Sequence, residues 1–221
     1  MITIFFGQKG GAMKSIGSEN YAVELAHRGN SVCLVDADPQ GTTADFIGYR
    51  EEAEIEPYIT CVQKEGRLTK TLRELDTRFD HVVVDVAGRA DDDHSQEMRS
   101  GLLAAHVAIS PFRPCQDNIN TIPKVDQIIQ TALDFNENLK VFSLISIAPT
   151  HHAVKETDDA REIISAWSSM QLLDTVIHDR KVYRDAYSKG LGVVEMDNKK
   201  AAEEIKSLVT EVLENVLHAT A

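Results

Sequence analysis

Apolar residues in this chain fall into two kinds of segment that alternate along its length. Short runs that are apolar at nearly every position predict strands buried on both faces. These runs are residues 2–6, 31–35, 81–85, 105–110, 140–147 and 172–177. Longer segments, with apolar residues three or four positions apart, predict helices. They cover residues 15–27, 67–79, 117–136, 152–169 and 198–217.

This alternation of buried strands and helices favours the α/β class. We predict a doubly wound, mostly parallel sheet with helices on both faces, formed by a single domain over residues 1–221. Ligands of such sheets bind beyond the carboxyl ends of the strands, near the point where the strand order reverses. The loops after Phe6, Val35 and Val84 are therefore where we expect the chemistry of this protein.

Composition narrows the function classes. The 221 residues include 35 Asp and Glu against 23 Lys and Arg, a net charge of −12. This excludes a polycation that coats nucleic acid over its whole surface, but not a local basic patch. No apolar run approaches the roughly 20 residues of a membrane span. The three cysteines are Cys33, Cys61 and Cys115; their wide spacing indicates a reducing compartment and neither a disulfide framework nor a metal site.

The loop after the first strand has the composition of a phosphate cradle. Two glycines let the backbone turn sharply and point its amides inward, and a helix begins directly afterwards. A lysine and a hydroxyl then supply a cation and a ligand for Mg²⁺. The expected nucleotide-binding residues are Gln8, Lys9, Gly10, Gly11, Ala12, Met13, Lys14, Ser15 and Ile16. The common P-loop pattern has glycine at the positions of Gln8 and Met13, so this loop is a variant of it.

Acidic residues follow the next two predicted strands. Asp36 and Asp38 stand two residues apart after the second strand, and Asp85 follows the third. At the carboxyl ends of neighbouring strands, such acids can orient a Mg²⁺ ion and position an attacking water. Each loop alone also suits ordinary turn chemistry. Three such loops together favour a nucleotide-hydrolysing site.

These three stretches, Gln8–Ser15, Val35–Gly41 and Asp80–Asp85, resemble the ParA/MinD family of deviant Walker A (P-loop) ATPases. Residues 110–117 and 180–195 are similar to the small plasmid-partition ParA proteins, often called ParF-like. The resemblance implies a P-loop NTPase fold, ATP and Mg²⁺ as ligands, and a sandwich homodimer that closes on ATP.

The resemblance also implies a role for each residue of the site. Lys9, Lys14 and Asp38 form the catalytic set: Lys9 reaches the phosphates bound by the partner subunit, Lys14 holds the β- and γ-phosphates, and Asp38 aligns the water. The metal set is Ser15, Asp36 and Asp85.

Two positions depart from the family pattern. Met13 stands where the family nearly always has glycine, and Ile16 where threonine is common. A glycine at such a position usually accommodates a conformation that disfavours a Cβ atom. Methionine is tolerated there if its φ angle is negative; otherwise we expect weaker nucleotide binding and weak ATPase activity, or a chain that is an altered form of the family.

Proteins of this type bind DNA non-specifically as ATP dimers and release it on hydrolysis, which a cargo-bound adaptor such as a centromere-binding protein stimulates. The resemblance therefore implies a cytoplasmic, nucleoid-associated protein that segregates a plasmid or chromosome. Basic residues are densest in the last fifth of the chain, where we expect DNA to bind: Arg180, Lys181, Arg184, Lys189, Lys199, Lys200 and Lys206. Dimerisation would double this patch.

Alternative functions remain open. One is a ParA-like ATPase that positions a protein cargo, such as a carboxysome or a chemoreceptor cluster, and another is a MinD-like factor bound to a membrane. A third is a metabolic relative, either an amidotransferase-linked synthetase or a nitrogenase-reductase type, although the spacing of the cysteines argues against the latter. The chain has no lysine or arginine after Lys206, which argues against membrane binding. We expect no metal site at Asp91–His94, which suits a helix N-terminus, or at the adjacent pair His151 and His152.

Overall fold

The computed structural model describes residues 1–88, 95–151 and 155–218. They form a seven-stranded sheet in the order β3-β2-β4-β1-β5-β6-β7, in which every neighbouring pair is parallel. The strands are β1 (Ile2–Phe5), β2 (Val32–Ala37), β3 (Thr60–Gln63), β4 (His81–Val86), β5 (Val107–Phe112), β6 (Lys140–Ala148) and β7 (Gln171–His178). The predicted parallel α/β sheet is confirmed.

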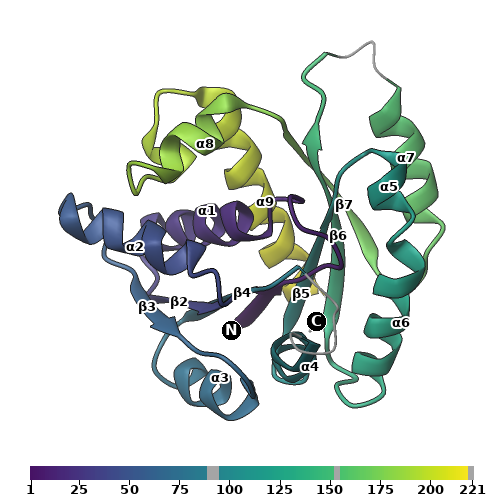
Figure 1. Ribbon diagram of the computed structural model, residues 1–221, viewed down its shortest axis with the longest axis horizontal. Helices are drawn as coiled ribbons and strands as arrows, with labels where there is room; N and C mark the ends of the chain where they lie inside the picture. The colour runs from purple at the N-terminus through teal and green to yellow at the C-terminus, as the bar shows by residue number, and fades with distance from the viewer. Residues whose placement is uncertain (89–94, 152–154, 219–221) are drawn as a thin grey trace.

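Helices cover both faces of this sheet (Figure 1). One face packs against α1 (Lys14–His27), α2 (Thr42–Glu52), α8 (Lys181–Tyr187) and α9 (Lys199–His218). The other packs against α3 (Thr69–Asp76), α4 (Ser95–Leu102), α5 (Gln116–Ile119), α6 (Ile122–Leu133) and α7 (Glu156–Ser165). A short 3₁₀ turn, Val193–Glu195, precedes α9. The expected double winding is therefore present.

The apolar positions of the strands form two cores, one on each side of the sheet. Along β1, Ile2 and Ile4 belong to the core under α3–α7, whereas Phe5 belongs to the core under α1 and α9. Successive residues of a strand point to opposite faces, so a strand covered on both sides must be apolar throughout. This explains why the central strands are largely apolar.

Some predicted elements differ from the structure. The helix expected over 117–136 is two helices, because Pro123 lies in the first turn of α6, where its missing N–H does no harm. The helix expected over 152–169 covers only 156–165 among the described residues. We did not predict β3, an edge strand that is partly exposed and lacks a continuous apolar run.

The structure defines the positions of two predicted acids relative to the ends of the strands. Strands β2 and β4 continue through Asp36 and Asp85, which are paired in register on neighbouring strands. Both acids thus lie on the sheet, and the loops that follow them lie next to the loop after β1.

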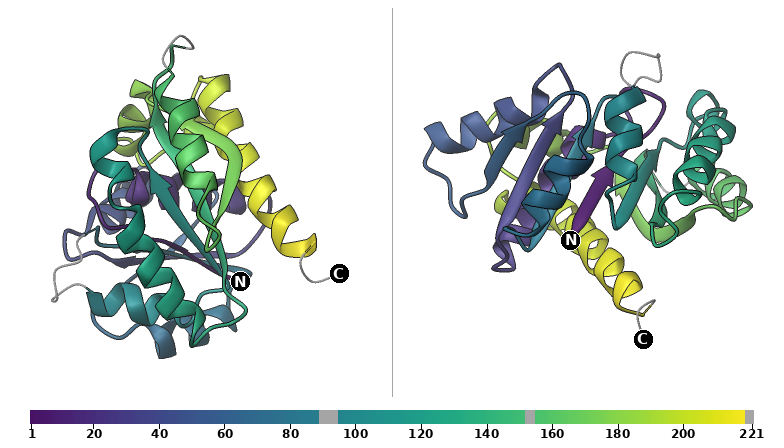
Figure 2. Two further views of the ribbon diagram at one scale, coloured as in Figure 1. Left: turned by 90° about the vertical axis from the view of Figure 1, so that its right-hand side faces the viewer. Right: turned by 90° about the horizontal axis from the view of Figure 1, so that it is seen from below.

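The two views of Figure 2 show α9 running along the sheet and ending at the margin of the molecule. Among the described residues, no helix combines the length and apolar content that crossing a bilayer requires.

Candidate functional site

A cavity of about 560 Å³ opens at the carboxyl ends of the strands. One wall is the phosphate loop, and the facing walls come from the loops after β2 and β4, from β6 and from the segment between β7 and α8. The lining residues include Gly10, Gly11, Met13, Lys14, Ser15, Ile16, Asp38, Gly88, Ile147, His178, Arg180, Tyr183 and Arg184. Most of the predicted nucleotide-binding residues therefore face one cavity, with Arg180 and Arg184 added from the predicted DNA set.

The phosphate loop contains two residues in the left-handed region, Gly11 at φ 77° and Met13 at φ 65°. The condition under which methionine would fit without strain, a negative φ, is therefore not met. Left-handed backbone costs an L-residue about 1–2 kcal/mol relative to glycine. Met13 offsets part of this cost because its side chain is half-buried and packs against the core beside α1. Helix α1 begins at the next residue, Lys14.

A second strained residue supports the loop from β6. The Ser146 hydroxyl donates a hydrogen bond of 3.1 Å to the carbonyl of Ala12, and Ile147 has φ 54° at an irregularity in the β6–β7 pairing. A positive φ is rare for a β-branched residue. Ile147 lines the cavity, and the hydrogen bond from Ser146 ties β6 to the phosphate loop. Nothing in the sequence indicated a role for Ser146 or Ile147, apart from their positions near the end of a predicted strand.

Lys14 lies buried at the base of the cavity, with its ammonium donating to the carbonyl of Lys9 at 3.1 Å. Burial lowers the pKa of Lys14, and the nearby carboxylates of Asp85 and Asp38 partly oppose this effect. Gly88, in the loop after β4, suits this arrangement, since a Cβ atom there would lie 2.9 Å from the Lys9 carbonyl oxygen and would overlap the Lys14 ammonium that donates to it. Lys14 is thus placed as a cation beneath the phosphate loop.

Asp85 lies fully buried beside Lys14, and the Thr43 hydroxyl donates to its Oδ2 atom at 2.9 Å. Burial raises the pKa of Asp85 to about 7, against the opposing effects of Ser15, Thr43 and Lys14. A further buried carboxyl, Glu19 of α1, lies 3.5 Å from the same hydroxyl, and burial raises its pKa well above the ordinary range. Thr43 and Glu19 were not predicted. A polar residue four positions after Ser15 on a buried helical face was the available signal for Glu19.

Asp36 organises the loop that carries Asp38. Its two carboxylate oxygens accept hydrogen bonds from the backbone N–H groups of Asp38 at 3.1 Å and Ala44 at 2.8 Å. Burial raises the pKa of Asp36, and these backbone donors oppose the rise. Asp38 itself is half-buried and lines the cavity. The two acids therefore differ in role: Asp36 shapes the loop, while Asp38 faces the space where a ligand would lie.

The residues predicted for Mg²⁺ suit an ion that is shared with a phosphate. Among the described residues, no donor forms a hydrogen bond with Asp85 Oδ1, although this atom is buried. Nor do the described residues contain a group of three or more His, Cys, Asp or Glu able to hold a metal alone. Mg²⁺ commonly takes one or two carboxylates together with substrate phosphates. Ser15, which lines the cavity, and Asp85, whose Oδ1 atom has no donor in the described part of the chain, suit that pattern, whereas both oxygens of Asp36 already accept hydrogen bonds from the backbone.

Lys9 points toward α5 in its own chain. Its ammonium forms an ion pair with the Asp117 carboxylate and a longer contact of 3.4 Å with the Asp117 carbonyl. Asp117 also accepts a hydrogen bond from the Cys115 thiol at 2.9 Å. The hydrogen bonds that the Asp117 carboxylate accepts from Cys115 and Lys9 lower its pKa to about 2. Both partners of the ion pair are exposed, with Lys9 at 44%, so Lys9 can leave Asp117 at little cost.

The predicted DNA residues divide into two groups. Arg180, Lys181 and Arg184 each form an ion pair within the chain, with Glu204, Asp185 and Asp179 respectively. The remaining four are exposed lysines, and within the described part of the chain no ion pair involves them. They are Lys189, Lys199, Lys200 and Lys206. The unneutralised positive charge of this region therefore lies on α9 and just after α8.

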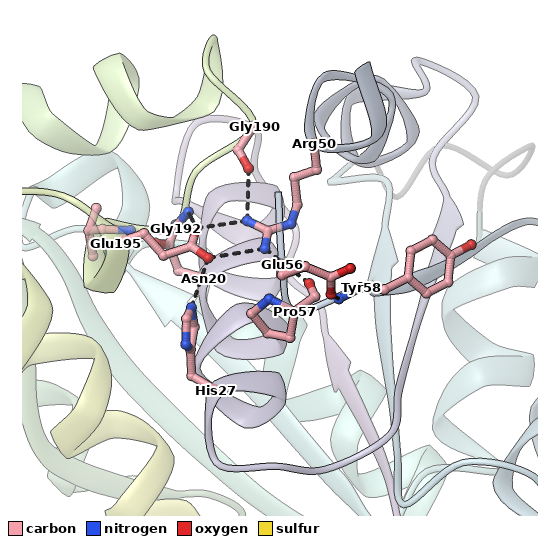
Figure 3. A network of polar contacts seen from close by, with 10 residues as sticks. Asn20, His27, Arg50, Glu56, Pro57, Tyr58, Gly190, Gly192 and Glu195 are labelled. Carbon is pink, nitrogen blue, oxygen red and sulfur yellow. Dashed lines mark hydrogen bonds and ion pairs between the residues drawn. The ribbon is translucent and has the colours of Figure 1, made fainter. Parts of the chain in front are cut away.

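A buried ion pair fastens α2 to the segment after α8 (Figure 3). The Arg50 guanidinium donates to both oxygens of Glu195, at 2.7 and 3.0 Å, and to the carbonyl of Gly190 at 2.8 Å. His27 approaches the same carboxylate at 2.8 Å. Gly190 has φ 65°, and a Cβ atom on it would overlap the α2 backbone at Arg50. This link fastens α2, whose first residue Thr42 lines the cavity, to the segment between α8 and α9.

We expected no metal site at Asp91–His94 or at the pair His151 and His152. Residues 91–94 and His152 lie outside the described part of the chain.

Comparison with known proteins identifies the family. Residues 3–194 match the profile of the CobQ/CobB/MinD/ParA nucleotide-binding domain. The chain belongs to this family. The match contains the phosphate loop and all three predicted acids, so the resemblance seen in the sequence is confirmed at the level of the family.

Known proteins resemble this chain, one over part of its sequence and others in their fold. A curated relative, "Protein ParA" of Rhizobium radiobacter, is 28% identical over 113 residues, which are 51% of this chain and 49% of the relative. The matched region thus spans about half the length of that relative. Over 96% of this chain and 98% of the other, the cell division ATPase MinD of Pyrococcus furiosus has a TM-score of 0.75 at 17% identity.

A plasmid partition protein of Borrelia burgdorferi has a TM-score of 0.69 at 14% identity, over 97% of this chain and 98% of that chain. At such identities the two structural likenesses show a shared fold.

Proposed function

We propose that this chain is a ParA-type ATPase that segregates DNA. Two copies close on ATP, the dimer binds DNA non-specifically, and hydrolysis releases it when a centromere-binding or cargo-bound adaptor stimulates turnover. The observation that supports this best is the cavity behind the glycine loop, which Lys14, Ser15 and Asp38 line, while Asp36 and Asp85 lie in register on the neighbouring strands β2 and β4. The ParA relative and the Borrelia partition protein support segregation as the purpose.

The residues of the cavity divide the work of phosphoryl transfer among them. The transition state is stabilised mainly by positioning and by positive charge. Lys14 supplies a fixed cation, and Asp38 faces the cavity from where it can orient an attacking water. Ser15, Asp36 and Asp85 would hold Mg²⁺, which neutralises phosphate charge when bound.

Lys9 makes hydrolysis depend on dimerisation in this proposal. Within its own chain it is engaged by Asp117, away from Lys14. Release from this exposed ion pair leaves a cation that can reach the phosphates held by a second copy. A cation supplied by the partner stabilises the transition state only after the dimer forms.

DNA binding is assigned to the four exposed lysines on and near α9. In a dimer their number doubles, which gives an affinity that falls steeply with salt. Arg180 and Arg184 line the nucleotide cavity instead, and we assign them to the ligand in that cavity. The net charge of −12 confines DNA to this local surface.

A DNA titration tests the proposal. We expect tight binding to non-specific duplex DNA with ATP and much weaker binding with ADP or without nucleotide. Replacing Lys199 and Lys200 by glutamine should weaken binding and make its dependence on salt shallower, by a slope of about 0.9 for each phosphate that is no longer neutralised. Lys140→Gln, at an exposed lysine that begins β6, is the matched control. Equal DNA affinity under all three nucleotide conditions would contradict the proposal.

A further inference from the structure

Glu204 of α9 contacts three side chains of the cavity wall at once. The Arg180 guanidinium donates to its Oε1 atom at 2.7 and 3.0 Å, and the Tyr183 hydroxyl donates to Oε2 at 2.9 Å. His178 adds its ring Nδ1 at 2.8 Å from Oε1 and its backbone N–H at 3.4 Å from Oε2. These contacts join β7 and α8 to the first half of α9.

The surroundings make this carboxylate an effective anchor. The Glu204 side chain is 11% exposed and that of Arg180 is 19% exposed, so solvent screens the pair only weakly. An ionised carboxylate only accepts hydrogen bonds, so the His178 ring must carry a proton on Nδ1. Burial, followed by the charge of Glu204, raises the pKa of Tyr183, which therefore stays protonated and donates. Glu204 thus fixes the orientation of its three partners.

The three partners line the cavity, whereas Glu204 stands behind them. They line the same cavity as the phosphate loop, so a nucleotide with its phosphates at Lys14 would have its remaining part within reach of them. We propose that Glu204 is a positioning residue for nucleotide binding, which holds Arg180, His178 and Tyr183 in the geometry that receives the ligand. This inference rests on the proposed function, because it requires that the cavity bind a nucleotide.

The same contacts connect the nucleotide to the DNA-binding surface. Lys199, Lys200 and Lys206 lie on α9 within five residues of Glu204. Glu204 therefore links the cavity wall directly to the helix that carries these lysines, beside the longer contact of the Tyr183 hydroxyl with the Ala201 carbonyl at 3.4 Å.

Nucleotide titration of a matched pair of variants tests this role. Glu204→Gln keeps the size of the side chain but turns a donor toward groups that are themselves donors. Glu203→Gln removes the same charge from an exposed neighbour on α9. With a fluorescent ATP analogue, we expect Glu204→Gln to bind about tenfold more weakly, the equivalent of one charge-assisted hydrogen bond. Glu203→Gln should bind as the unaltered chain does.

A double-mutant cycle with Arg180→Gln separates positioning from general damage to the fold. If Glu204 acts through the wall, its substitution should cost less than about threefold in the Arg180→Gln background. Full additivity, or unchanged affinity in Glu204→Gln, would overturn the inference.

If Glu204→Gln does not fold, Tyr183→Phe removes a single donor to the same carboxylate, and we expect it to weaken binding about threefold. An unchanged affinity in that variant would also overturn the inference. An unaltered chain that binds no nucleotide would instead refute the proposed function.

Discussion

The ion pair between Arg50 and Glu195 offers the sharpest test of how the fold supports the site. Arg50→Met retains most of the apolar length of the side chain but removes its charge and all its donors. The exposed fractions of the two side chains are 3% and 9%, so the substitution leaves a buried carboxylate without its main partner. His27 remains beside it but is itself 39% exposed.

The expected loss of stability follows from this burial. Removing one partner of a buried ion pair typically costs about 3–5 kcal/mol. For a chain of this size each kcal/mol lowers the melting temperature by about 2–4 °C, so we expect a decrease of about 6–20 °C. An exposed ion pair such as that of Arg78 and Glu74 should contribute at most about 1 kcal/mol, and Arg78→Met is the control.

Thermal unfolding followed by circular dichroism measures these changes. The double variant Arg50→Met, Glu195→Gln should recover a large part of the lost stability, because no uncompensated charge then remains buried. A decrease below about 2 °C in Arg50→Met would refute the reasoning, and so would a double variant less stable than either single one.

The pH dependence of the same pair has a definite sign. Burial raises the pKa of Glu195, but hydrogen bonds from Arg50 and His27 outweigh this effect and hold it below 4.5. A carboxylate with a lowered pKa adds stability above its ordinary pKa and loses that stability as the pH falls through the folded value. The difference in melting temperature between the unaltered chain and Arg50→Met should therefore narrow once the pH falls below the ordinary pKa of a glutamate, about 4.3.

Three further predictions concern the cavity. Lys9→Ala should abolish ATP-dependent dimerisation in size-exclusion chromatography while ADP binding survives; an unchanged dimer would reject the role of Lys9 in trans. Asp38→Ala should bind ATP but hydrolyse it at least about a hundredfold more slowly, and normal turnover would remove Asp38 from the catalytic set. At Met13, thermal stability should be no lower with glycine than with methionine and lowest with valine, which tolerates a positive φ poorly; a valine variant as stable as the glycine variant would contradict backbone strain at this position.

Much of the fold was accessible from the sequence because its signals are local. Apolar runs predicted β1, β4 and β6. Each of these strands is buried on both faces, so nearly every residue of the run is apolar. The break between α5 and α6 was missed because the helix predicted over 117–136 includes Pro123, which marks the first turn of α6. The edge strand β3 was missed because it is only partly buried and lacks an apolar run.

The candidate site was predicted where its residues follow strands. Lys14, Asp38 and Asp85 could be placed together because the carboxyl ends of parallel strands meet at the same edge of a sheet. Thr43, Ser146 and Glu204 could not be placed, since each contributes through a contact with a residue at least 21 positions away in the chain.

By itself, the sequence determined the class of fold, the phosphate loop and the acids near it. The signals for these features are the apolar periodicity, the positions of the glycines and the order of residue types, and each lies within a short stretch of the chain. Tertiary structure decided the sign of φ at Met13, the partner of Lys9, and which basic residues remain unpaired. These depend on packing between elements distant in the chain, where the position of one carboxylate determines whether an arginine lies free on the surface or is held at the wall of a cavity.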